Sequence, residues 1–262
     1  LRRNKIFELK LKMSLYFAYG REAVEHLQKK DQKLALVIER VGHINRKVDE
    51  DLYSSVVHHI IGQQISSRAQ QSIWERLIAL VGAVKAETIL PLGRENLQKI
   101  GITFKKADYI LAFTQKVVAK EVDLEALPQK TDEEILSILS SLDGIGEWTA
   151  QMIMLFCMNR MNVFPFKDLA VIRGMRMVYR HRKIDRTLFK KYEKRLAPYC
   201  SVASLYFWAV AGGAIPELTD PAPTIKKDKK NPKTKEDPQK PNASKSQKSV
   251  KTKEATQNLA TA

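Results

Sequence analysis

Apolar residues recur at three- and four-residue spacing along most of the chain between residues 13 and 225, which is the period of one face of an α-helix. The clearest runs are residues 23–42, 49–65, 66–82, 104–120 and 132–142. Neither alternating apolar and polar positions nor repeats of fixed period stand out. The pattern therefore predicts an all-α protein of roughly ten helices with ordinary lengths.

Polar residues and glycines indicate where these helices begin and end. Asp49 and Ser66 are typical residues for a helix start. Thr131 followed by Glu134 fits a capping box, in which each side chain bonds to the backbone of the other. Glycines favour the position just after a helix, and three of them are expected to mark helix ends: Gly42, Gly82 and Gly101.

The two ends of the chain differ in composition from the middle. From Lys226 onward there are eleven lysines, four acidic residues and no aromatic residue. Such a segment cannot bury enough apolar surface to fold, so residues 226–262 are interpreted as a disordered basic tail. Residues 1–12 are also basic, and they form either a short N-terminal arm or a segment upstream of the natural start at Met13. The folded region is then 13–225.

Composition narrows the class of protein. The formal net charge is +16, but residues 226–262 contribute +7 and residues 1–12 contribute +4, so the folded region is only mildly basic. A polyanionic partner is consistent with this charge, which by itself is a weak argument for nucleic acid. Two cysteines exclude a disulfide framework and suit a reducing cytoplasm. The longest apolar run, Met152 to Met158, is far too short to span a membrane.

The stretch "LDGIGEWTAQ", residues 142–151, places two glycines between two helical patterns. Gly144 suits a turn with positive φ, and Gly146 lets the next helix begin without a side chain in the way. Free backbone N–H groups and the positive end of the helix dipole would then form a seat for a DNA phosphate. The alternative is an ordinary helix end and tight turn, because a G-x-G sequence is common.

A proline and an aspartate follow about twenty residues later, in "NVFPFKDLAVIRG". Asp168 stands just ahead of a new helix, where aspartate is also a routine N-cap. The glycine hairpin followed by Pro165-x-x-Asp168 resembles the helix-hairpin-helix/GPD superfamily of DNA glycosylases. That resemblance implies that Asp168 is the catalytic carboxylate. It also implies two helical lobes with the active site in the cleft between them.

Three motifs resemble the 3-methyladenine DNA glycosylase II (AlkA-like) branch of the superfamily. "VVHHIIGQQISSRAQ" is similar to a helix with a Gly-Gln-Gln sequence, Trp148 stands where that branch has Trp, and "CSVASLYFWAVAGG" resembles the helix that brings an aromatic residue, here Trp208, to the pocket. The resemblance covers roughly residues 50–215.

The chain also departs from the superfamily in places. The N-terminal β domain of the best-known member has no counterpart, because the preceding segment is too short and too helical. Two cysteines cannot hold the iron-sulfur cluster of a related branch. Leu142-Asp143 replaces the more usual Leu-Pro at the start of the hairpin.

The resemblance implies a set of residues for extruding a base. Phe104 matches the wedge position, with Lys105 and Lys106 beside it for the flanking phosphates. Trp148 and Trp208 would form an aromatic pocket that attracts a cationic base, and Met152 stands where relatives carry Tyr. The alternative for Phe104, and for the pocket residues, is ordinary core packing.

Asp168 is expected to be ionised, to stabilise positive charge on the deoxyribose and to orient water. By resemblance, the DNA backbone is expected to contact the amides of Gly144 and Gly146, together with Glu147 and Lys167. No cofactor is required. The carbonyls expected to hold a Na⁺ or K⁺ ion in the hairpin belong to Ser140, Leu142 and Ile145.

The five histidines (His26, His43, His58, His59 and His181) are scattered and lack zinc-ligand spacing, so a zinc site is not expected. His58 and His59 precede the Gly-Gln-Gln sequence, where they either edge the pocket or pack in the core.

The sequence therefore predicts a monofunctional glycosylase that removes an alkylated purine of the 3-methyladenine type from double-stranded DNA. Strand cleavage is not expected, because Trp148 stands where nicking relatives carry a lysine. Two alternatives remain: the same fold acting on uracil, hypoxanthine or an oxidised purine, and a non-catalytic helix-hairpin-helix DNA-binding protein. The expected state is a monomer that does not bind membranes, in the bacterial nucleoid or a eukaryotic nucleus.

Overall fold

The computed structural model describes residues 16–49 and 51–222, which fold almost entirely into helices. These residues form twelve α-helices and two short 3₁₀ helices, with no strand beyond one isolated bridge between Tyr16 and Lys47. The all-α prediction is thus confirmed. None of the helices in this part of the chain is long and apolar enough to cross a membrane. The predicted N-terminal arm, residues 1–12, and the predicted tail, residues 226–262, lie outside the described residues.

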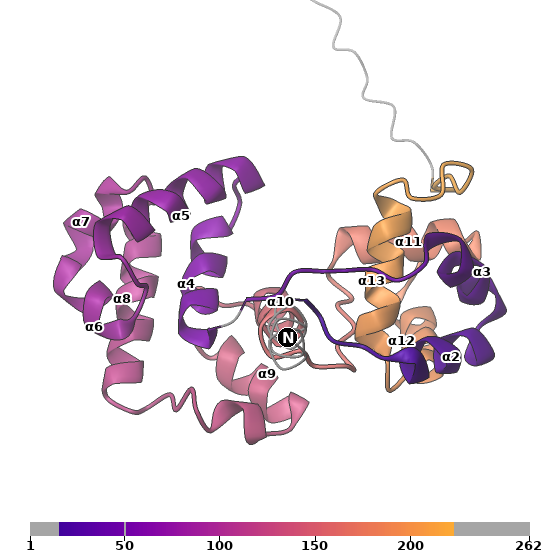
Figure 1. Ribbon diagram of the computed structural model, residues 1–262, viewed down its shortest axis with the longest axis horizontal. Helices are drawn as coiled ribbons and strands as arrows, with labels where there is room; N and C mark the ends of the chain where they lie inside the picture. The colour runs from indigo at the N-terminus through magenta and orange to yellow at the C-terminus, as the bar shows by residue number, and fades with distance from the viewer. Residues whose placement is uncertain (1–15, 50, 223–262) are drawn as a thin grey trace, which may run out of the picture. The chain divides into compact units, whose positions relative to one another are not determined.

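The helices follow one another along the chain, and a long connection joins α3 to α4 (Figure 1). The N-terminal half contains α2 (Arg21–Lys30), α3 (Gln32–Val41), α4 (Leu52–Gly62), α5 (Ser67–Val81), α6 (Ala86–Ile89), η1 (Leu90–Leu92), α7 (Gly93–Lys99) and α8 (Phe104–Val118). The C-terminal half contains η2 (Leu127–Gln129), α9 (Asp132–Ser140), α10 (Glu147–Phe156), α11 (Leu169–Tyr179), α12 (Arg186–Leu196) and α13 (Cys200–Ala211).

The helices pack in two groups, as the resemblance implies (Figure 1). Helices α4 to α8 contact one another in the first group, and α2, α3, α11, α12 and α13 contact one another in the second. The α9–α10 hairpin joins the first group through contacts between α10 and α4. The start of the described chain therefore packs against its end, and the Tyr206 hydroxyl donates a hydrogen bond to the Gly42 carbonyl at 3.1 Å.

Helices α11 and α13 approach each other closely because of Gly174. A Cβ atom at this position would overlap with the backbone carbonyl of Phe207 on α13, so only glycine permits this contact. The close crossing matters for function, because Asp168 stands at the start of α11 and Trp208 lies on α13.

Most predicted helix boundaries are confirmed, and two are wrong. Ser66 caps α5, the Thr131–Glu134 capping box begins α9, and Gly42 and Gly82 cap α3 and α5. Gly101 follows the cap of α7 by one residue, with φ of 108°.

The two errors arise because other aspartates cap these helices. Asp49 does not start α4: Asp51 does, and its carboxylate accepts from the Ser54 N–H at 2.6 Å. The continuous pattern over 23–42 is split at Asp31, which caps α3. Asp31 is buried and also accepts hydrogen bonds from the Tyr179 hydroxyl at 3.0 Å and the Arg195 guanidinium at 2.9 Å.

Candidate active site

A cavity of about 860 Å³ opens between α4, α10, α13 and the segment before α4. Its lining includes the predicted pocket residues Trp148, Met152, Asp168 and Trp208. The cavity is also lined by the sequence-distant Gly62–Ile65 turn and by four residues before α4: Ile44, Arg46, Lys47 and Asp49. The structure thus brings together the residues that the sequence assigns to catalysis and to base binding.

Asp168 lies at the N-terminus of α11 and is only 7% exposed. Its Oδ1 accepts hydrogen bonds from the N–H groups of Ala170 at 2.9 Å and Val171 at 2.8 Å, as expected for an N-cap. Oδ1 also accepts from Nε1 of Trp208 at 3.0 Å, and Oδ2 accepts from Nε1 of Trp148 at 2.9 Å. The N-cap interpretation is therefore correct, and it describes the same geometry that fixes the carboxylate in the cavity.

Four donors directed at the two oxygens of Asp168 match an ionised carboxylate, which only accepts hydrogen bonds. The positive end of the α11 dipole favours the same form. Three of these bonds reach Oδ1 and one reaches Oδ2, so Oδ2 keeps unused acceptor capacity. Oδ2 is therefore the atom able to face a bound substrate or an attacking water.

The two tryptophans that donate to the Asp168 carboxylate lie on two different helices, α10 and α13. Trp148 on α10 is 41% exposed, and Trp208 on α13 is half-buried with its ring 5.5 Å from that of Phe156. Met152 is only 4% exposed, so it belongs to the core as well as to the cavity wall. The alternative of plain core packing is therefore wrong for Trp148 and describes part of the role of Met152.

The hairpin between α9 and α10 has the expected glycine geometry. Gly144 has φ of 80°, and a Cβ there would overlap with the ring of Tyr109. Both the backbone conformation and the lack of space therefore favour glycine. Gly146 is exposed and caps α10 without a side-chain hydrogen bond, and a Cβ there would meet nothing within 4 Å. The fold itself does not need glycine at Gly146, whereas the close approach of a partner to the start of α10 would.

The Gly-Gln-Gln turn contains a strained residue that the sequence did not reveal. Gln64 is exposed, lines the cavity and has φ of 57°, a conformation that costs a residue other than glycine about 1 kcal/mol or more. The turn is fixed on one side by the Gln63 amide, which donates to the Gly144 carbonyl at 2.7 Å. Strain held in place at a cavity rim is typical of a functional position.

Lys106 fixes the other side of this turn, a role that the sequence did not show. Its Nζ donates to the carbonyls of Ile61 at 2.8 Å and Gln63 at 2.7 Å, and partial burial lowers the pKa of its ammonium. Two of the three ammonium N–H groups are therefore engaged with the end of α4, and a phosphate contact by the third stays a prediction. Lys105 is exposed, with Nζ 5.7 Å from the centre of the Tyr109 ring, and stays a prediction for phosphate contact.

Phe104 is the first residue of α8. It is 43% exposed, so the alternative of an ordinary core residue is wrong. The Arg94 guanidinium covers its ring at 4.3 Å from the centre, and Phe104 does not line the cavity.

Lys167 and Glu147 form an ion pair between the start of α10 and the residue before Asp168. Lys167 Nζ lies 2.7 Å from Glu147 Oε2, and both side chains are substantially exposed. Because exposed pairs of this kind are weak, Lys167 can exchange this partner for a phosphate at low cost.

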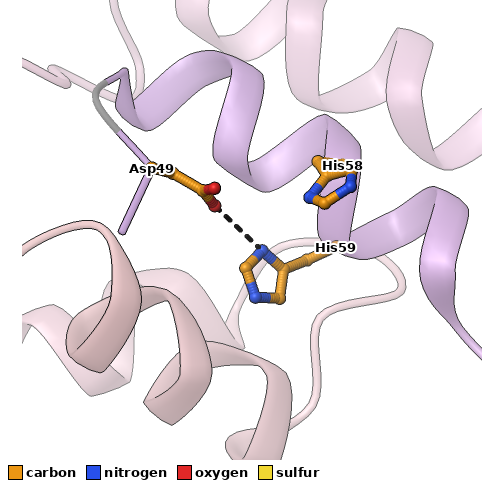
Figure 2. A group of neighbouring side chains, drawn as sticks. All are labelled: Asp49, His58 and His59. Carbon is orange, nitrogen blue, oxygen red and sulfur yellow. Dashed lines mark ion pairs between the residues drawn. The ribbon is translucent and has the colours of Figure 1, made fainter. Parts of the chain in front are cut away.

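Two histidines and an aspartate form a polar group on the cavity wall (Figure 2). Asp49, His58 and His59 each place one polar atom within 4.8 Å of the others. The spacing of histidines in the sequence did not predict this cluster, because Asp49 comes from outside α4. Burial lowers the pKa of both histidines. Both histidines line the cavity, which agrees with the first of the two alternatives, and His58 also packs against Trp74.

Comparison with known proteins places the chain in a family. Residues 57–198 match the family model described as HhH-GPD superfamily base excision DNA repair protein. The chain belongs to this superfamily. The predicted resemblance is therefore confirmed over more than half of the chain, from the middle of α4 to the end of α12.

Individual members of the superfamily match most of the chain. The crystal structure of a DNA-3-methyladenine glycosidase from Bacillus halodurans superposes with a TM-score of 0.70 at 30% identity, over 77% of this chain and 94% of that one. The DNA-3-methyladenine glycosylase 1 of Schizosaccharomyces pombe is 25% identical over 191 residues, covering 70% of this chain and 84% of the relative. A structure of the Schizosaccharomyces pombe 3-methyladenine DNA glycosylase with abasic DNA shares the fold, with a TM-score of 0.64 at 22% identity over 73% and 97% of the two chains.

Proposed function

We propose that this protein is a monofunctional DNA glycosylase, acting as a monomer, that extrudes an alkylated purine of the 3-methyladenine type from double-stranded DNA and hydrolyses its glycosidic bond. The observation that carries the proposal is the Asp168 carboxylate, held by two indole N–H groups on the wall of a cavity large enough for a base. A protein that only binds DNA through the hairpin needs neither the cavity nor the buried carboxylate.

DNA is proposed to bind across the hairpin. The exposed start of α10, with Gly146 as its cap, offers backbone N–H groups and a positive dipole end to a phosphate. Lys105 and Lys167 would add charge on either side. The carbonyls of Ser140, Leu142 and Ile145 are proposed to hold a monovalent cation. The Leu142 carbonyl accepts one hydrogen bond, from the Ile145 N–H at 3.0 Å, which leaves it a second lone pair for the ion. Such an ion would add positive charge beside the phosphate.

Base release follows from the geometry of the cavity. The extruded purine would lie against the Trp208 ring, whose π face attracts a cationic, alkylated base. As the glycosidic bond breaks, positive charge develops on the deoxyribose and the ionised Asp168 stabilises it. Oδ2 of Asp168 has acceptor capacity to orient the water that attacks the sugar carbon. The alkylated base leaves without acid assistance, because it already carries positive charge.

We propose that Gln64 fills the space left by the extruded base, in addition to Phe104, the wedge proposed from the sequence. Gln64→Ala is expected to slow single-turnover excision from a fully paired duplex at least tenfold, because extrusion would leave an empty gap in the stack. The loss should shrink when the lesion is mispaired, since less pairing energy opposes extrusion. Phe104→Ala, measured on the same two duplexes, shows whether Phe104 or Gln64 contributes more to filling the gap. An equal Gln64→Ala loss on both duplexes would contradict the proposal.

The reaction is expected to leave an abasic site in an intact strand. Strand-nicking glycosylases use an amine to form a Schiff base, and the hairpin position used for that purpose is Trp148 here. Lys167 is engaged with Glu147, and Lys47 also lines the cavity. Borohydride added during turnover should therefore trap no covalent protein–DNA adduct. An adduct that disappears in Lys167→Gln or in Lys47→Gln would identify a lyase and its nucleophile.

A panel of duplexes that each carry one lesion tests the substrate assignment. We expect release of 3-methyladenine, and no release of uracil or 8-oxoguanine. Release confined to uracil, hypoxanthine or 8-oxoguanine would keep the chemistry and change the substrate. Tight DNA binding without release of any base would favour the non-catalytic binding protein.

A further inference from the structure

The polar cluster on the cavity wall, formed by Asp49, His58 and His59 and extended by Ser55, is not used by the proposed catalytic step. Figure 2 shows the Asp49 carboxylate directed at the imidazole of His59, with His58 beside it on α4. His58 packs edge-on against Trp74 at 4.8 Å, whereas Asp49 and His59 face each other across 4.0 Å. Asp49 and His59 both line the cavity that contains Asp168.

Hydrogen bonds fix the orientation of this cluster. The Ser55 hydroxyl donates to Asp49 Oδ2 at 2.6 Å, and the Asp49 N–H donates to the Phe156 carbonyl at 2.7 Å. His59 Nδ1 lies 2.8 Å from the Ser55 carbonyl, which can only accept, so Nδ1 carries the proton. Burial lowers the pKa of His59 and favours the neutral ring. Its Nε2, on the side of the ring away from Asp49, is then a hydrogen-bond acceptor (Figure 2).

Short contacts connect this cluster to the surface on which the base would stack. Phe156, which accepts the Asp49 backbone hydrogen bond, has its ring 5.5 Å from Trp208, and Trp208 donates to Asp168. The Arg46 guanidinium covers the Phe156 ring at 4.6 Å. Other amide donors nearby are occupied, since Gln63 donates to Gly144 and Gln70 donates to His58. Asp49 and His59 therefore add two hydrogen-bond acceptors to this wall, one of them a carboxylate, beside the cationic Arg46 and Lys47 that also line the cavity.

We propose that Asp49 and His59 recognise the edge of the extruded base and select a cationic purine that carries an exocyclic amino group. The proposal rests on the glycosylase function proposed above and narrows its substrate. The 6-amino group of 3-methyladenine offers two N–H donors, and the alkylated nucleotide is positively charged. Ethenoadenine is neutral and has no amino group, and hypoxanthine presents an oxygen at the same place. Neither base would donate a hydrogen bond to Asp49 and His59 once it fills the cavity, and a site built to accept hydrogen bonds rejects such a base strongly.

Two variants of the cluster test the proposal against a matched control. Asp49→Asn and His59→Leu should each lower the ratio of single-turnover rates for 3-methyladenine over ethenoadenine at least tenfold. The ethenoadenine rate should equal or exceed that of wild type, because ethenoadenine donates a hydrogen bond to neither acceptor. Asp51→Asn removes the same charge two residues away, from an exposed helix cap outside the cavity, and should leave the ratio unchanged. His59→Gln restores an acceptor and should recover part of the ratio.

An equal fall in both rates, or an unchanged ratio, would overturn the proposal and leave the glycosylase function intact. Binding of free 3-methyladenine and free ethenoadenine to the full-length protein, followed by tryptophan fluorescence, gives a readout that does not depend on catalysis. Weaker binding of 3-methyladenine alone in Asp49→Asn would support base recognition even if wild type released neither base. Stoichiometric zinc binding that is lost in His59→Leu would instead identify the cluster as a metal site and overturn the proposal.

Discussion

Asp168→Asn is expected to lower the single-turnover rate of base release roughly 10³-fold while leaving the affinity for lesion-containing DNA within a few-fold. The substitution removes the negative charge that stabilises the deoxyribose as the bond breaks. The amide NH₂ of Asn would also face a donor in either orientation. In one orientation it opposes the Trp148 N–H, and in the other it opposes the N–H groups of Trp208 and of the backbone. The rate should be measured with enzyme in excess, so that product release does not obscure the chemical step.

The fold should tolerate this change, because Asn caps a helix about as well as Asp. Asp185→Asn is a matched control, since Asp185 caps α12 in the same way, accepting from the Leu188 N–H at 2.8 Å, and does not line the cavity. The control should retain the wild-type rate. If Asp168→Asn kept most of that rate, Asp168 would be only a helix cap, and the catalytic assignment would fail.

Trp208→Ala has the second largest expected effect, a loss of roughly tenfold to 200-fold in single-turnover excision. Base stacking on an aromatic ring contributes about 1–3 kcal/mol, and the variant also loses a hydrogen bond to Asp168. Trp208→Phe separates the two contributions, because it keeps an aromatic face and removes only the N–H donor. The Phe variant should retain more activity than the Ala variant on every alkylated base.

Thermal unfolding of the same two variants tests the alternative that Trp208 is a core residue. Trp208 is half-buried and contacts Phe156, so Trp208→Ala will lower the melting temperature somewhat. A large fall in melting temperature, with wild-type kinetics in the remaining folded protein, would assign Trp208 to the core. Equal rates for the Ala and Phe variants would show that the ring does not stack on the base.

Features determined by local sequence were predictable. Gly144 takes the positive φ that its place after α9 suggests, and Thr131 and Glu134 form their capping box. Asp168 could be placed because a proline and a helix start flank it. Asp49 shows the limit of this reasoning, since Asp51, two residues later, is an equally good cap and begins the helix instead.

Features that depend on tertiary contacts could not be predicted. The positive φ of Gln64 is imposed by the bonds of Gln63 and Lys106 to segments far along the chain. The sequence shows the charge of Lys106, which suggests a phosphate ligand, but it does not show the carbonyls of Ile61 and Gln63 to which the ammonium donates. The cluster of Asp49 with His59 depends on the packing of the segment before α4 against α4 itself. Gly174 permits the contact between α11 and α13, yet a glycine within a helical pattern gives no sign of its neighbour.

Release of free 3-methyladenine from a methylated duplex by the full-length protein is the most direct test of the proposed activity. The small-molecule products should be identified by chromatography and mass spectrometry, and the DNA strands should be sized before and after alkali. With wild-type protein we predict free 3-methyladenine, a strand that is intact before alkali, and one alkali-sensitive site for each base released. With Asp168→Asn we predict neither the free base nor the alkali-sensitive sites. Absence of the free base with wild-type protein, or strand breaks before alkali, would contradict a monofunctional alkylpurine glycosylase.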